Sequence, residues 1–150
     1  MAIYRHVRDK DDLLDELVDD LLAVAWRPKM STRRWREWVE DAADRFRKFL
    51  VSQPIALSVY LRHPVTSPAA VARMEAMLQV LNDGLGDDEF ARRAYAAIHT
   101  YTVGFAALEA SRNSTSISLA SPLERELAEF TTPAQFRQAL KSLISGYVQT

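Results

Sequence analysis

Residues 94–108, A-Y-A-A-I-H-T-Y-T-V-G-F-A-A-L, carry no formally charged side chain on any side. They lie within a segment that we expect to form one long helix from residue 87 to about residue 112. A helix that is apolar all round has to be covered all round. A subunit interface is the easier way to cover its outer face in a chain of this size, and burial inside a monomer is the alternative. Several small side chains would let another helix approach closely: Ala96, Ala97, Gly104, Ala106, Ala107 and Ala110.

The segments on both sides also show apolar residues at helical spacing. We predict helices over residues 11–25, from Ser31 or Thr32 to Pro54, 55–62, from Ser67-Pro68 to a stop in Asn82-Asp83-Gly84 and Gly86, 123–130 and 133–148. Ser67-Pro68 and Thr132-Pro133 are the expected caps of the helices that follow them. Ser and Thr dominate residues 111–121, which predicts a loop over most of this stretch. No stretch alternates with the period of a strand. The fold class is therefore all-α, a helical bundle of about seven helices.

Composition limits the classes of protein to which the chain can belong. It has 150 residues, 48% of them hydrophobic and 26% charged, as expected for a soluble globular domain. It contains no cysteine, so disulfides and thiolate metal sites are excluded, which fits the reducing cytoplasm. No signal peptide and no run of about 20 apolar residues is present, so we expect no membrane segment. The net charge of −1 offers no general attraction for nucleic acid.

The last predicted helix supports the interface suggested by residues 94–108. The predicted helices 87–112 and 133–148 from each of two subunits would form a four-helix bundle about a two-fold axis. We therefore predict a homodimer whose interface includes Ala107, Ala110, Phe136, Leu140, Leu143, Ile144 and Tyr147.

Isolated polar groups on these apolar helices indicate a second feature, a pocket for a small molecule. Buried polar groups need partners, and a ligand can supply them. We predict a pocket for a mostly hydrophobic organic molecule, lined by several of Trp38, Tyr60, Met74, Met77, Tyr95, His99, Thr102 and Phe105. Taken alone, a residue of this kind more often belongs to ordinary core packing than to a ligand site.

Signatures of catalysis are absent from the sequence. The three histidines, His6, His63 and His99, form no helical metal-binding pair, and no phosphate-binding loop or nucleophile elbow occurs. The basic group Arg45, Arg47 and Lys48 is interleaved with acids, which predicts a solvated helix face. We therefore expect no enzyme activity, no metal and no cofactor.

Residues 3–14, I-Y-R-H-V-R-D-K-D-D-L-L, resemble the end of the DNA-binding domain in the TetR family of bacterial repressors. In that family a short helix with a Leu-Tyr-x-His pattern is followed by a turn with Asp and Lys and then by Leu-Leu. Residues 97–109 are similar to the eighth helix of the tetracycline-repressor branch, in which the eighth and tenth helices form the dimer. The resemblance implies a transcriptional repressor that senses a small-molecule effector. It also implies DNA phosphate contacts from Tyr4, His6 and Lys10.

The resemblance places most of the helix-turn-helix ahead of residue 1. Residues 1–10 would then be the remnant of that domain, and residues 11–150 the effector-binding and dimerisation domain. We expect the 150-residue chain to bind DNA weakly and without sequence preference, and a longer parent to bind a palindromic site. The alternative is a free-standing helical dimer that binds a small molecule or a protein partner without DNA. The nucleotides upstream of the reading frame would separate the two hypotheses.

Overall fold

The computed structural model describes residues 10–25, 34–62, 67–114 and 121–148. These contain seven helices and no strand, which confirms the all-α fold class. The helices are α1 (Lys10–Ala25), α2 (Trp35–Ser52), α3 (Pro54–Arg62), α4 (Pro68–Leu85), α5 (Asp88–Ser114), α6 (Pro122–Glu129) and α7 (Pro133–Gly146). Tyr4 and His6 lie outside the described residues, and Lys10 begins α1. Within the described ranges, no helix has the length and apolar character needed to cross a membrane.

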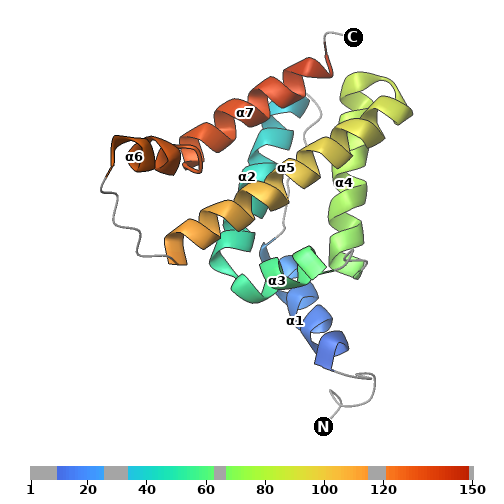
Figure 1. Cartoon of the computed structure of the whole chain (residues 1–150). Helices are drawn as coiled ribbons and strands as arrows, with labels where there is room; N and C mark the ends of the chain where they lie inside the picture. Colours follow the sequence, from blue (N-terminus) through green and yellow to red (C-terminus); the bar gives the residue numbers. More distant parts are fainter. Residues whose placement is uncertain (1–9, 26–33, 63–66, 115–120, 149–150) are drawn as a thin grey trace.

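Helix α5 is the axis of the molecule, with α7 along one flank and α4 along the other (Figure 1). One hydrophobic cluster joins α2, α4, α5 and α7 and contains Val39, Met77, Ile98 and Phe136. A second cluster joins α1, α2, α3, α4 and α5 nearer the N-terminus. Because α2, α4 and α5 contribute to both clusters, they hold the two halves of the bundle together.

The end of α4 lies at the last residue of the predicted stop, Gly86. The Asn82-Asp83-Gly84 sequence does not stop the helix, which continues to Leu85. Gly86 ends it in the left-handed conformation with a φ of 73°, and its N–H donates to Asn82 O at 2.8 Å. Gly84 has a different role, since a Cβ there would lie 2.4 Å from the Trp35 ring. This glycine therefore permits close packing of α2 on α4.

Helix starts follow capping chemistry in three places. Thr132 accepts from the Gln135 N–H at 3.3 Å, which confirms the predicted cap of α7. Ser121 and Glu124 form a reciprocal capping box at the start of α6. Ser67, the expected cap of α4, makes no such bond. Instead Asp19 of α1 accepts from the Ala69 N–H at 2.7 Å, so a side chain of α1 caps α4.

Helix α5 extends further than predicted and occupies the first residues of the expected loop. Residues 111–114 form its last turn, and residues 115–120 lie outside the described residues. Arg112 donates to the carbonyl oxygens of Ala128 and Thr131, which follow in α6 and after it. These bonds tie the C-terminal end of α5 to the α6 region.

Candidate functional site

A buried polar group lies where α4 faces α5. Arg73 of α4 is only 3% exposed. Its Nη2 donates to Tyr95 Oη at 3.2 Å and to His99 Nδ1 at 3.1 Å. Tyr95 and His99 are four residues apart on α5, so both present their polar atoms on the same side of that helix. The Arg73 guanidinium also lies 4.0 Å from the centroid of the Phe46 ring, a cation–π contact.

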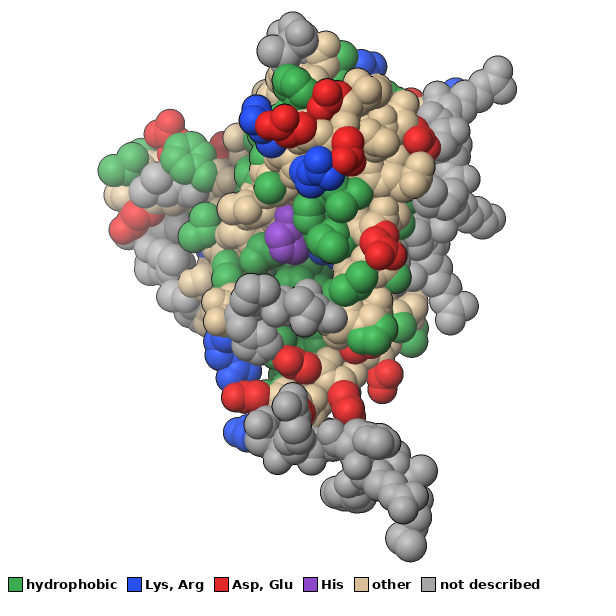
Figure 2. Space-filling view, turned by 90° about the vertical axis from the view of Figure 1, so that its right-hand side faces the viewer, with side chains coloured by type: hydrophobic (Ala, Val, Ile, Leu, Met, Phe, Trp, Pro, Cys, Tyr) green, Lys and Arg blue, Asp and Glu red, His purple; other side chains and the backbone are tan. Residues whose placement is uncertain are grey.

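Aromatic rings enclose this group. The His99 ring stacks on Tyr95 at 5.5 Å and on Phe46 at 5.8 Å between centroids. Tyr60 of α3 meets Phe46 edge to face at 5.2 Å and lies 6.2 Å from His99. Figure 2 shows a histidine side chain reaching the surface between hydrophobic side chains, and His99 is the one histidine among the described residues. The site therefore combines side chains from α2, α3, α4 and α5.

The imidazole in this site is neutral at physiological pH. Burial and, to a smaller extent, the charge of Arg73 together lower the pKa of His99 from 6.5 to about 4. Because an arginine can only donate, Nδ1 of His99 accepts and the ring hydrogen is on Nε2. The Nε2–H group is thus a donor that a bound molecule can use.

One buried polar atom of the site, Arg73 Nε, has no hydrogen-bond partner in the described part of the chain, whereas Tyr60 Oη interacts with the Arg73 guanidinium. Burial raises the pKa of the Tyr60 hydroxyl, and the nearby charge of Arg73 partly opposes that shift. No ion pair joins Arg73 to a carboxylate among the described residues. Buried polar groups normally have hydrogen-bond partners. A buried cation with an unpaired donor is therefore a candidate for binding a ligand.

The residues that we predicted to line a pocket divide into two groups. Tyr60, Tyr95 and His99 meet at the Arg73 group, and the half-buried Met74 follows Arg73 on α4. Met77, Thr102 and Phe105 are core residues; Thr102 Oγ1 donates to Ile98 O at 2.7 Å, and Phe105 packs on Phe136. Trp38 packs against the cluster formed by α2, α4, α5 and α7.

Sequence reasoning missed the two residues that define the site, Phe46 and Arg73. Phe46 belongs to the apolar stripe of α2 and looks like ordinary core. A signal for Arg73 was present, because it follows Ala70 by three residues and precedes Met77 by four, and both are buried. A charged residue on the buried stripe of an amphipathic helix needs a special explanation.

A second buried arginine contradicts the prediction of a solvated basic face. Arg47 is 2% exposed; its Nη1 lies 2.5 Å from Glu109 Oε2, and its Nη2 lies 2.8 Å from Asp44 Oδ1. Burial alone would raise the Asp44 pKa, but Lys48 and Arg47 outweigh it and hold this pKa below its usual value. The prediction was wrong for Arg47 because this residue lies between the buried Ala43 and Leu50 on the inner face of α2.

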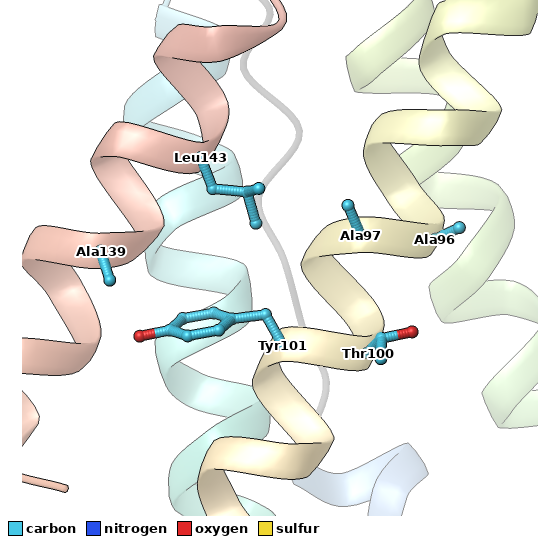
Figure 3. Close-up of a pocket in the computed structure, with 6 residues that line it drawn as sticks. All are labelled: Ala96, Ala97, Thr100, Tyr101, Ala139 and Leu143. Carbon is cyan, nitrogen blue, oxygen red and sulfur yellow. The ribbon is translucent and has the colours of Figure 1, made fainter. Parts of the chain in front are cut away.

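The outer face of α5 and α7 forms an open, largely apolar groove. Its walls are Ala96, Ala97, Thr100, Tyr101, Ala139 and Leu143. Figure 3 shows Tyr101 extending from α5 toward α7 and Leu143 extending back from α7. The Tyr101 hydroxyl donates to Phe136 O at 3.3 Å, and the two rings stack. Gly104 and Leu108 continue the exposed face along α5. The described residues of a single chain thus leave the uncharged surface of α5 uncovered on this side.

The predicted interface residues divide between this face and the core. Leu143 lines the groove. Ala107 and Ala110 are half-buried against the second hydrophobic cluster, and Tyr147 is half-buried against the first. Phe136, Leu140 and Ile144 are buried within one chain, with exposures of 0%, 0% and 2%. These three residues recur every four positions and form the inner stripe of α7, which packs against the core. They therefore present no surface to a second subunit and contribute to an interface only by holding α7 in place.

Comparisons with known proteins identify the family. Residues 27–146 match the family described as "Tetracyclin repressor-like, C-terminal domain". The chain therefore belongs to this family of transcriptional regulators, and the resemblance noted in the sequence is confirmed. Its members are regulators and not enzymes.

A curated relative and two solved structures agree with this assignment. A transcriptional regulator of the helix-turn-helix type from Saccharopolyspora erythraea is 30% identical over 111 residues, which cover 72% of this chain and 46% of the relative. The chain thus spans about half the length of that relative. The TetR family protein ActR of Streptomyces coelicolor, in complex with actinorhodin, has the same fold, with a TM-score of 0.75 and 22% identity over 97% of this chain and 79% of that one. A TetR variant from Acinetobacter baumannii in complex with minocycline gives a TM-score of 0.75 and 23% identity, over 99% and 77% of the two chains.

Proposed function

We propose that this chain is the effector-sensing and dimerisation part of a transcriptional repressor, and that its effector binds at the Arg73 group. The observation that supports this most directly is the position of the site relative to α1. The site takes Tyr60 from α3 and Arg73 from α4. Helix α1 packs on both of these helices and caps α4 through Asp19. A molecule that displaces Tyr60 or Arg73 therefore acts on the two supports of α1.

The proposed signal passes from α1 toward the N-terminus. The family resemblance puts the DNA-binding helices ahead of α1, so a shift of α1 in each subunit would change the spacing of two DNA-reading heads. Binding can drive such a shift only if the effector has different affinities for the two arrangements. Tyr4, His6 and Lys10 remain our predicted phosphate contacts. ActR and TetR are described in complex with actinorhodin and minocycline, which supports a ligand-binding role for this fold.

The occupant of the groove on α5 and α7 is, in this proposal, a second copy of the same chain. The exposed small residues Ala96 and Gly104 would let the partner's helix approach, and the uncharged surface would need cover from water. An isologous contact about a two-fold axis would bury both copies of the face at once.

The dimer is tested with Leu143→Arg in the groove. This substitution would bury an unpaired charge in the proposed contact. Sedimentation should show a dimer for the unmodified chain and a dimer dissociation constant raised at least about 100-fold in the variant. Leu61→Arg is the matched control, since Leu61 is an exposed leucine on α3, and it should leave the dimer intact. A monomeric unmodified chain would refute the interface.

Operator binding is tested by mobility shift on the DNA upstream of the gene. A version extended to include the upstream coding sequence should bind selectively, and the 150-residue chain should not. Tight, sequence-selective binding by the 150-residue chain would mean that the DNA-binding element has been misplaced.

A further inference from the structure

We infer that the molecule recognised at this site is a hydrophobic organic acid, whose carboxylate pairs with Arg73. The inference rests on the proposed effector-sensing function and adds the chemical class of the effector. Its basis is a charge that the described residues leave uncompensated. Burying a cation is costly unless a counter-charge and hydrogen bonds offset the loss of water.

The neighbours of Arg73 are electrically neutral. Nη2 donates to a phenol oxygen and to a neutral imidazole, and the guanidinium covers a phenyl ring. Asp19 of α1 acts electrostatically on Tyr60, and its Oδ1 accepts from the Ala69 N–H to cap α4. A buried arginine is usually paired with a carboxylate. No described carboxylate forms such an ion pair with Arg73.

The hydrogen-bonding groups that remain are donors. Arg73 Nε is buried without a partner, and His99 Nε2 carries a hydrogen. Tyr60 Oη interacts with Arg73 as an acceptor, and its own hydrogen can still turn toward a bound acceptor. A carboxylate has only acceptor sites and matches such a set, and an arginine can hold it in a charge-assisted pair. A cationic ligand would be repelled, and a neutral one would leave the charge of Arg73 unpaired.

The surroundings define the rest of the molecule. Phe46, Tyr95 and Tyr60 provide ring faces and edges around the polar group. Flat apolar surfaces of this kind favour an aromatic or otherwise hydrophobic body. A single guanidinium suits one negative charge better than a phosphate, which carries nearly two and loses more water on burial.

The test uses pairs of ligands that differ only in charge. Naphthalene-2-carboxylate is compared with naphthalene-2-carboxamide, and decanoate with decanamide, by isothermal titration on the 150-residue chain at pH 7.5. At least one acid should bind about 10-fold or more tightly than its amide. In Arg73→Met the preference should disappear, whereas Arg73→Lys should keep part of it. Arg92→Met, at an exposed arginine of α5 paired with Asp88, is the matched control and should change nothing.

Each outcome supports or overturns the inference. The comparison of acid with amide in the unmodified chain does not depend on any variant folding, and circular dichroism checks the fold of Arg73→Met. Equal binding of acids and amides would overturn the acid assignment and leave a ligand-sensing site. An acid preference that survives in Arg73→Met would place the anion elsewhere and also overturn it. If no member of either pair binds, the inference fails, whereas the sedimentation and mobility-shift tests of the proposed function keep their own outcomes.

Discussion

Arg47 on α2 and Arg73 on α4 are buried to almost the same extent, but their partners differ. Arg47 is paired with two carboxylates, Asp44 on its own helix and Glu109 on α5. Arg73 contacts a phenol, an imidazole and a phenyl ring, with no described carboxylate to neutralise it. In the first arrangement carboxylates neutralise the buried charge, and the ion pair with Glu109 joins α2 to α5. In the second arrangement the buried charge is not neutralised. Such a cost in stability is expected at functional sites rather than in an ordinary core.

The largest expected effect is that of Arg47→Met. Removing this guanidinium leaves Asp44 and Glu109 buried without their counter-charge, which should lower the free energy of unfolding by about 3–5 kcal/mol. Urea unfolding followed by circular dichroism measures the change. Arg45→Met is the control, because Arg45 pairs with Asp41 on the surface and should cost less than about 1 kcal/mol.

A small effect of Arg47→Met would break the comparison. If the free energy of unfolding falls by less than about 1 kcal/mol, Asp44 and Glu109 must become hydrated or protonated when Arg47 is absent. The ion-pair network would then have no structural role. The double variant Arg47→Met with Glu109→Gln sharpens the result. It should be more stable than the sum of the two single changes predicts, because each single change leaves a buried charge unpaired.

A smaller effect concerns the neutral partner of Arg73. The folded-state pKa of His99, about 4, is lower than its ordinary value of 6.5. The unfolded chain therefore binds the proton first as the pH falls, and stability is lost from about pH 6.5 downward, approaching 3 kcal/mol in total near pH 4.

His99→Gln tests this pH dependence. Arg73, Tyr60 and Tyr95 surround the imidazole, and none of them supplies a negative charge that would favour its protonation. Urea unfolding at pH 7 and pH 4.5 should therefore show about 2–3 kcal/mol less loss in the variant than in the unmodified chain. Contributions of surface carboxylates are common to both proteins and cancel. Equal losses would show that His99 is protonated freely within the fold.

The fold was largely predictable from the sequence, because local signals and apolar periodicity agree. Thr132-Pro133 and the α7 stripe gave the last helix its start and its buried face. The failures occurred where a tertiary contact overrides a local signal. Of the two glycines in the predicted stop of α4, Gly86 ends the helix, whereas Gly84 lies inside it and gives room for the Trp35 ring. Ser67 looks like a cap, but Asp19, far away in sequence, takes that role.

The site was predictable only in part. Tyr95 and His99 stood out as polar groups on an uncharged helix, and Tyr60 as an aromatic residue nearby. Arg73 and Phe46 could not be joined to them, because their proximity depends on how α2 and α4 pack on α5. Charge in a sequence also does not reveal burial. Arg45, Arg47 and Lys48 look alike in the sequence, yet only Arg47 faces the core.

The smallest expected effect on stability, and the one that separates the two arginines, is that of Arg73→Met. Methionine is similar in length, is apolar and adapts to irregular gaps, so it can replace the stem of the arginine between the rings. The change removes a buried cation that no described carboxylate neutralises, and replacing such charges by apolar groups is often neutral or stabilising. The hydrogen bonds lost are those to Tyr95 and to His99, each worth about 1 kcal/mol. We therefore expect the free energy of unfolding to change by less than about 1 kcal/mol in either direction, because these terms oppose each other. A loss comparable to that of Arg47→Met would mean that Arg73 is a structural residue already satisfied by its neutral partners, and the contrast between the two arginines would disappear.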